Sequence, residues 1–238
     1  MTTRHNISQA DNLYHGKVRY ELYNKDQGLS KGIVMSHIKV CELGAVATAD
    51  ADGLCDDVDI TATAGGAVSV SGALATGGVG TLTHPRALTV TFAAGTTATL
   101  TITGADEYGE TMVEAIAGTA TGTTAGVKCF KTVTSITTDE ATTTASPVNV
   151  GVGDVFGLPF YIEDAGKVIS VSQSGSALAT GLTITAGVTT AATATTGDVR
   201  GTITGHTGDG STYLTATILI DDPCTTKDAA FGVDQFAG

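Results

Sequence analysis

Short runs of alternating apolar and polar residues dominate this chain from residue 45 onward, and they constrain its fold more than any other feature. Leu88, Val90 and Phe92 alternate with threonines, and Leu100 and Ile102 do the same. Glycine interrupts such runs at intervals of about eight to twelve residues, a spacing typical of proteins built from many short strands. Strict alternation places one face of a strand in a core and the other in water. The pattern predicts an all-β protein of the β-sandwich or jelly-roll-like kind.

The composition changes near Gly44 and again near Pro147, which divides the chain into three segments. Residues 1–44 carry six of the twelve Lys and Arg residues and three of the six Tyr residues, so we interpret them as an extended N-terminal arm. Residues 45–150 and 151–238 are predicted to form a first and a second β domain, joined by the apolar segment 156–160. Within the arm, residues 33–40 fit either a strand or a short helix, and their periodicity does not distinguish the two.

Two stretches of the first β domain allow more detailed predictions. Residues 97–103 and 110–116 alternate, and the glycine-bearing segment 104–109 between them predicts a hairpin with a loose loop. In residues 127–136 the apolar side chains fall on both parities, so that strand is expected to be covered on both sides.

The charge balance and the length of the apolar stretches exclude two classes of partner. The formal net charge is −12, and no basic cluster follows Gly44, which argues against nucleic acid as a direct partner. The longest apolar stretches are only as long as strands, so no membrane span is predicted. A strongly acidic surface instead favours a soluble protein that resists aggregation.

A structural metal site is not expected, although one acidic segment leaves a question open. Asp50 and Asp52 precede Gly53, and three more aspartates follow before residue 60. Such a loop could bind calcium through several carboxylate oxygens, but the spacing does not match the EF-hand pattern. The alternative, which the sequence favours, is a solvated acidic turn without an ion.

The cysteines and the first residues bear on the compartment. Cys41, Cys55, Cys129 and Cys224 lie far apart in the sequence and form neither a CxxC pair nor a zinc-finger spacing with histidine. Residues 1–12 are polar and lack the apolar core of a secretion signal. We therefore expect the protein to fold in a reducing cytosol with its thiols free.

No catalytic motif is recognisable. The five histidines are scattered, no GxSxG elbow is present, and the glycine-rich stretches lack the lysine of a phosphate-binding loop. A triad assembled in space remains an alternative, because its members need not be neighbours in sequence. The sequence predicts no enzyme, no catalytic residue and no cofactor.

Scarce arginines and the tyrosines of the arm are the candidate interface residues. Arginine and tyrosine bury much area for little loss of conformational freedom. Arg86, in a His-Pro-Arg segment expected just before a strand, and Arg200, in Asp-Val-Arg, could contact another subunit or pair with a carboxylate of their own chain; we favour the second. The candidate interface set is Arg4, Tyr14, Arg19, Tyr20, Tyr23, Arg86 and Arg200.

Several phrases of the chain together resemble a known group of proteins. They are residues 48–53, 72–74 running on to Pro85 and Arg86, 104–114, 130–135, 157–159, 198–202 and 231–236. Residues 45–238 resemble the Thr/Ala/Gly-rich virion structural proteins of tailed bacteriophages, particularly the head decoration or capsid cement type. The arm lies outside the likeness.

The resemblance implies a mechanical function. Such a protein binds the outer surface of the capsid in many copies, with the major capsid protein as its partner, and clamps neighbouring capsid subunits. It is expected to be a homotrimer at local three-fold positions, located on the virion exterior after assembly in the host cytoplasm. Two alternatives stay open: a phage tail tube or fibre subunit, and, from another class, a secreted β-sandwich adhesin or carbohydrate-binding module.

Overall fold

The computed structural model describes residues 37–60, 66–92, 98–119, 122–139, 147–174, 181–188 and 193–220. Within these ranges the chain is all-β, as predicted, and contains no α-helix. The elements are β1 (His37–Ala45), β2 (Asp50–Asp59), β3 (Ala67–Val68), β4 (Ala75–Thr76), β5 (Val79–Phe92), β6 (Thr99–Ala105), β7 (Thr111–Ala117), β8 (Gly122–Thr138), β9 (Pro147–Gly157), the 3₁₀ turn η1 (Ala165–Lys167), β10 (Val168–Gln173), β11 (Thr183–Ala186), β12 (Gly201–Thr204) and β13 (Tyr213–Ile220).

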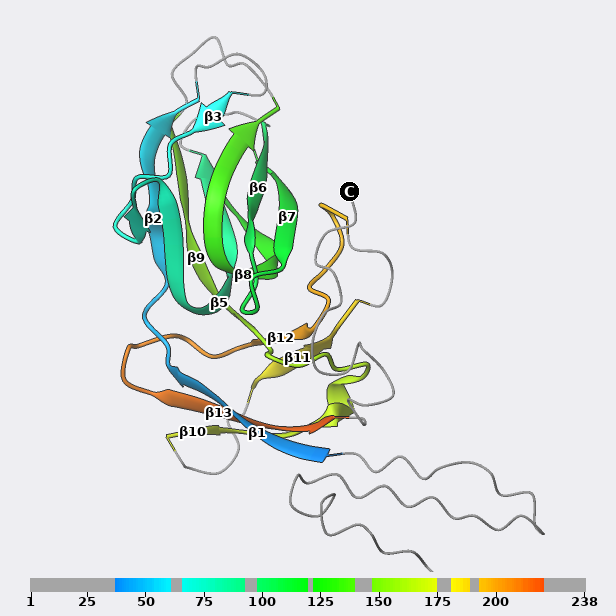
Figure 1. Cartoon of the computed structure of the whole chain (residues 1–238). Coiled ribbons are helices and arrows are strands. Elements are labelled where there is room, and N and C mark those ends of the chain that lie inside the picture. Colours follow the sequence, from blue (N-terminus) through cyan, green and yellow to red (C-terminus); the bar gives the residue numbers. More distant parts are fainter. Residues whose placement is uncertain are drawn as a thin grey trace, which may run out of the picture.

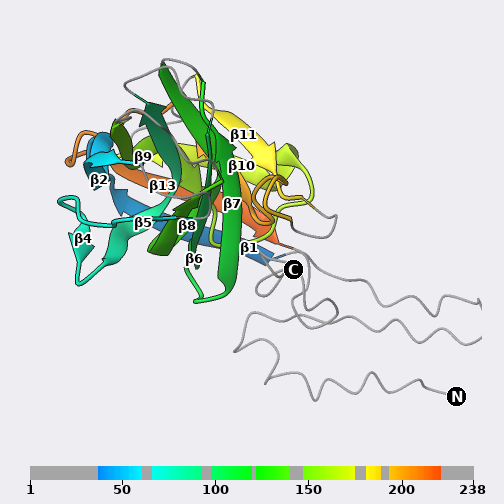
Figure 2. The ribbon, with the colours of Figure 1, turned by 90° about the horizontal axis from the view of Figure 1, so that it is seen from above.

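The strands form two curled antiparallel sheets (Figure 1). The large sheet has the order β11-β12-β9-β5-β8-β6-β7, with β2, β3 and β4 paired to β9, β8 and β5 at its sides. The small sheet has the order β1-β13-β10. Figure 2 looks down on the upper strands and shows β1 and β13 passing beneath them. The small sheet therefore closes the lower end of the curled large sheet.

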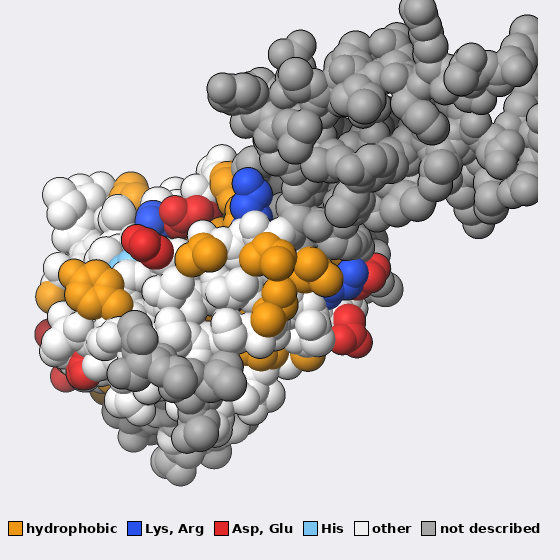
Figure 3. All heavy atoms as spheres, turned by 90° about the horizontal axis from the view of Figure 1, so that it is seen from below, with side chains coloured by type: hydrophobic (Ala, Val, Ile, Leu, Met, Phe, Trp, Pro, Cys, Tyr) orange, Lys and Arg blue, Asp and Glu red, His pale blue; other side chains and the backbone are white. Residues whose placement is uncertain are grey.

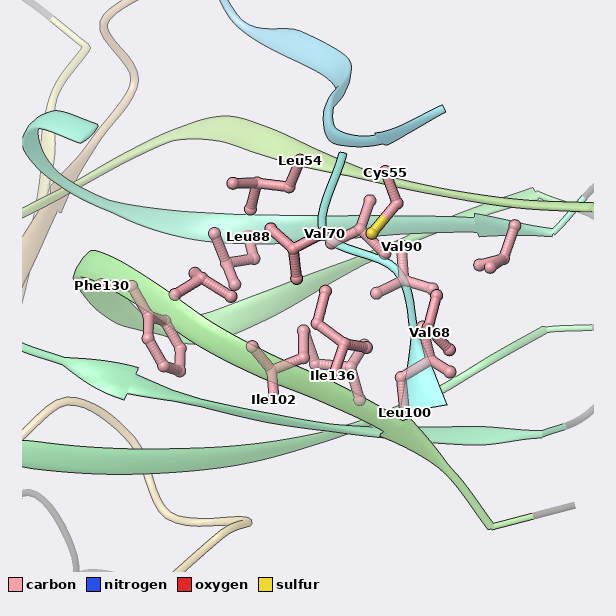
Figure 4. Close-up of a cluster of buried hydrophobic side chains, with 14 of the residues drawn as sticks. Leu54, Cys55, Val68, Val70, Leu88, Val90, Leu100, Ile102, Phe130 and Ile136 are labelled. Atoms are coloured by element: carbon pink, nitrogen blue, oxygen red, sulfur yellow. The ribbon is translucent and has the colours of Figure 1, made fainter. Parts of the chain in front are cut away.

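The upper part of the large sheet encloses the first hydrophobic cluster (Figure 4). Leu88 and Val90 of β5 are fully buried, and Leu100 and Ile102 of β6 face them from across the core. These are the residues whose alternation with threonine was visible in the sequence. Their burial confirms that a period of two marks the core face of each strand.

The predicted hairpin is also confirmed. β6 and β7 pair from Thr99↔Ala117 to Ala105↔Thr111, so the loop lies between Ala105 and Thr111. Asp106 Oδ1 accepts hydrogen bonds from the backbone N–H groups of Tyr108 and Glu110. Gly109 has φ +83°, a left-handed conformation that favours glycine.

The two-sided cover predicted for residues 127–136 holds only around Cys129 and Phe130, because Val127, Thr134 and Ser135 are exposed. Phe130, Val133 and Ile136 belong to the first cluster, whereas Cys129 is buried near Gly157 on another side. Thr103 of β6 pairs with Ser135 of β8, and the next residue, Gly104, pairs with Val133. Thr134 is therefore an extra residue in β8 with no residue of β6 opposite it. This bulge changes the phase of the side chains, which brings both parities into the core.

The small sheet and the lower end of the large sheet enclose a second cluster. Leu43 of β1 and Leu214 and Ile218 of β13 pack in it with Phe156 of β9 and Ile203 of β12. β1 contains all of residues 37–44, the last part of the predicted arm, so this part is a strand of the fold. The remaining arm, residues 1–36, lies outside the described residues.

β9 spans the predicted boundary between the two β domains. Its first half contributes Val148, Val150 and Val152 to the first cluster, and Phe156 near its end belongs to the second. Two cores thus exist, but they share a continuous strand.

The acidic segment, interpreted from the sequence as a turn, is instead strand β2. Leu54 and Cys55 are buried in the first cluster, and the strand pairs with β9. Asp56 and Asp57 are exposed at a register shift between Cys55 and Val58, where Asp57 takes φ +45°. Two buried anchors and a partner strand outweigh the turn propensity of the aspartates.

Candidate interaction surface

Five of the seven predicted interface residues lie outside the described residues: Arg4, Tyr14, Arg19, Tyr20 and Tyr23. The other two, Arg86 and Arg200, are each 4% exposed and bind groups of their own chain. Their pairing fits the intramolecular alternative, and a contact with another subunit stays a prediction for them. Both lie where the two clusters meet.

Arg86 lies within β5 rather than before a strand, because β5 already begins at Val79. Its Nη2 donates to Asp154 Oδ1 at 2.8 Å. Nε donates to the Gly153 carbonyl at 2.8 Å, and Nη1 to the Ala47 carbonyl at 2.7 Å. The guanidinium also lies 5.2 Å from the centroid of the Phe156 ring. Burial lowers the pKa of Arg86, and the Asp154 carboxylate opposes that effect.

Arg200 makes a second, separate set of buried contacts. Its Nη1 pairs with Asp106 Oδ2 at 2.5 Å, with both side chains buried. The guanidinium lies 4.7 Å from the Tyr108 ring centroid, and the Tyr108 hydroxyl donates to the Pro159 carbonyl at 2.6 Å. The β6–β7 loop is thereby fastened to the segment that follows β9.

Residues 193–200, the segment before β12, lie against β7 and β8. Asp198 accepts hydrogen bonds from the backbone N–H groups of Cys129 at 3.0 Å and Arg200 at 2.8 Å. Lys128 Nζ donates to the Thr193 carbonyl at 2.7 Å. The Ala194 carbonyl accepts from the N–H of Ala115 at 2.8 Å, so this segment also covers part of the edge of β7.

Glu114 is a second buried carboxylate near this segment. It is 2% exposed, and its Oε1 accepts from the N–H groups of Val127 at 2.5 Å and Lys128 at 3.3 Å. Burial raises its pKa to about 7, although both hydrogen bonds and the charge of Lys128 oppose the rise. A Cβ added at Gly126 would meet Glu114 Oε2 at 2.6 Å, so glycine makes room for the carboxylate.

These groups join segments of the chain that are distant in sequence. Each charged head contacts a carbonyl, an N–H group or an opposite charge of its own chain. The described residues contain no group of three or more His, Cys, Asp or Glu side chains placed to hold a metal ion. Burial raises the pKa of the free thiols of Cys41 and Cys55 to about 11 and about 12, so both are protonated and weak nucleophiles near neutral pH.

The outer side of the small sheet carries several large apolar side chains that are exposed. Ile38 and Val40 of β1 are 63% and 65% exposed, Ile169 of β10 is 52% exposed, and Tyr213 of β13 is 59% exposed. Figure 3 shows apolar side chains gathered on this side of the molecule. We call Ile38, Val40 and Ile169 the outer apolar face. Large exposed apolar groups that lie together commonly mark an interaction site.

The outer apolar face follows from the register of the small sheet. Val40 lies opposite Thr217, and Thr217 lies opposite Ser170 of β10, next to Ile169. Ile169 is the extra residue at the register shift between Val168 and Ser170, which places it in solvent. The three side chains thus lie at one end of the sheet, where the chain enters β1.

The same end of the sheet has a free strand edge. β1 pairs with β13 alone among the described strands, so its other edge presents backbone N–H and C=O groups without a ladder partner there. Such an edge is a template for pairing with another extended segment. Sequence reasoning missed this surface, although the apolar residues on both parities of 38–43 indicated a strand with two apolar faces.

Comparisons with protein-family models, with curated proteins and with solved structures find no match for this chain. Separately, the described ranges hold no helix with the length and apolar character that a membrane crossing needs.

Proposed function

We propose that the protein is a structural subunit of a virus particle, of the head decoration type found in tailed bacteriophages. In this proposal a homotrimer binds the outer surface of the capsid and clamps neighbouring copies of the major capsid protein. The protein performs no catalysis and acts through its shape, its stiffness and its contacts.

The observation that carries the proposal is the outer apolar face beside the free edge of β1. Ile38 and Val40 are more than half exposed in the single chain, although removing isoleucine and valine side chains from water is favourable. A protein that attaches to a larger assembly needs such a surface, and multivalent attachment converts weak single contacts into high avidity.

The joint between the two clusters supports a mechanical role. Arg86 and Arg200 fasten the two cores at separate points, and each guanidinium is buried against a carboxylate. Buried charge pairs with further hydrogen bonds hold one geometry, because separating them would leave charges unpaired in the interior. A body of this kind transmits force between its contacts instead of bending.

Co-sedimentation with empty shells tests the proposal. The shells are assembled from the major capsid protein encoded nearest to this gene, and the purified full-length protein is added in increasing amounts. We expect saturable binding at a fixed ratio of copies to capsid subunits, together with greater resistance of the shells to heat. Shells that neither bind the protein nor gain resistance at any salt concentration would overturn the proposal.

A further inference from the structure

We infer that residues 17–23 of a second copy of this chain add to the free edge of β1 as an antiparallel strand and cover the outer apolar face. The inference deepens the proposed function, because it rests on the proposed self-association and names the surface and the segment that produce it. It commits to one occupant, a neighbouring copy.

The receiving surface offers both elements that strand addition requires. The backbone of the β1 edge supplies donors and acceptors that no described strand pairs, and Ile38 and Val40 supply apolar side chains on the outer side. In strand addition the backbone bonds provide affinity, and alternate side chains provide specificity. The partner segment must therefore be extended, with apolar residues at every second position.

Residues 17–23 have this pattern. Their sequence is Lys-Val-Arg-Tyr-Glu-Leu-Tyr, so Val18, Tyr20 and Leu22 alternate with charged residues. As a strand the segment would present three apolar side chains on one side and Lys17, Arg19 and Glu21 on the other. No other stretch within residues 1–36 alternates over seven residues in this way.

One register fits both sides of the sheet. Residues that lie opposite each other in an antiparallel pair point to the same face, so Val18, Tyr20 and Leu22 must oppose even-numbered residues of β1 to meet Val40. With Tyr20 opposite Val40, Leu22 meets Ile38 and Glu21 meets Lys39. A shift by two residues in one direction would place Arg19 opposite Lys39, and like charges directly opposite each other are unfavourable. A shift in the other direction would lose the pairing of Glu21 with Lys39 and place the polar Asn24 opposite Ile38.

The inference commits to a neighbouring copy because it rests on the proposed self-association. Ile38 and Val40 are 63% and 65% exposed, so this face can receive a segment of another chain. Passing the segment from each copy to the next is a head-to-tail contact, which closes into a ring when the rotation fits, as in the proposed trimer.

Crosslinking between marked chains tests the inference without any capsid. One full-length chain carries Tyr20→Cys and the other, made longer by a tag, carries Val40→Cys; both carry Cys224→Ser. A short bis-maleimide is added to the mixture. We expect a crosslinked product that contains one chain of each length. Tyr23→Cys, on the opposite side of the segment, is the matched control and should give at least about tenfold less product.

Three results would overturn the inference. A double variant Y20C/V40C that crosslinks only within one chain at every dilution would show that the arm covers its own face. Products of two Val40→Cys chains without mixed products would show that two faces pair directly. Absence of any product, with a monomer at all concentrations in light scattering, would show that no copy binds there.

A point substitution provides a second readout. Val40→Asp places a charge in the proposed contact and should weaken self-association at least about tenfold in light scattering. Val79→Asp introduces the same charge at another exposed valine, on β5, and should leave self-association unchanged. Circular dichroism verifies that both variants are folded. If the shells bind the protein but no mixed crosslink forms, the inference fails and the proposed function stands. If the mixed crosslink forms but the shells do not bind the protein, the inference stands and the proposed function fails.

Discussion

Arg86 of β5 and Asp154 of β9 form a 2.8 Å ion pair at the point where the two hydrophobic clusters meet. The same Asp154 oxygen accepts a hydrogen bond from the N–H of Gly208, and Arg86 also binds the carbonyl of Ala47. Chain segments before β2, in β9 and before β13 thereby converge on one pair. This pair is the best place to test how the two cores are joined.

Replacing Arg86 with methionine should destabilise the protein by about 3 kcal/mol, because it leaves a carboxylate and several carbonyls without their buried partner. Urea unfolding followed by circular dichroism measures the change. Lys131→Met, which removes a partly exposed ion pair with Glu107, is the matched control and should cost less than about 1 kcal/mol. Equal losses for the two variants would contradict the structural role of Arg86.

Glu114 should make the folded protein less stable as the pH rises. Its pKa is raised from an ordinary value of 4.5 to about 7 by burial, so the folded state binds its proton more tightly than the unfolded state. This contribution to stability is fully present below about pH 4.5 and is lost as the pH rises through about 7. Its size is at most about 3 kcal/mol, because a tenfold change in proton affinity corresponds to about 1.4 kcal/mol.

Glu114→Gln isolates that effect from the other carboxylates. The free energy of unfolding of both proteins is measured between about pH 5 and about pH 8, a range that brackets the raised pKa. We expect the wild type to lose stability relative to the variant as the pH rises. A difference between the two proteins that stays constant with pH would show that Glu114 does not titrate there.

The effect of deleting the arm on stability should depend on the residue at which the deletion ends. Deletion of residues 1–36 stops before β1 and should leave the β signal in circular dichroism and the unfolding midpoint nearly unchanged. Deletion of residues 1–44 removes most of β1, so it exposes an edge of β13 and uncovers the side chains of Leu214 and Ile218. That variant should be strongly destabilised or aggregate. Equal stability of both deletions would contradict the place of β1 in the second core.

The thiols of Cys41, Cys55 and Cys129 should resist alkylation in the native protein. All three are buried, and burial raises the pKa of each, so little thiolate exists near about pH 8. Mass spectrometry after iodoacetamide treatment should find these three residues unmodified in native buffer and modified after denaturation. Rapid modification of Cys55, which is fully buried in the first cluster, would be the clearest contradiction.

The local pattern of the sequence determined most of the strands. Alternation in residues 88–92 and 99–103 predicted core faces that the structure confirms, because a side-chain period of two is a property of any extended strand and needs no knowledge of its partner. The hairpin at 104–109 was predictable for the same reason, since its strands and its loop are neighbours in the chain.

Only the tertiary structure decided how charges and edges are used. The aspartates of 50–59 form a strand because β9 pairs with them, and Arg86 is buried because carbonyls distant in sequence converge around it. Ile38 and Val40 are exposed because β1 lies at the edge of a small sheet whose other side is already occupied by the second core. Which of two apolar faces is covered depends on contacts between distant segments, and a local pattern carries no record of those contacts.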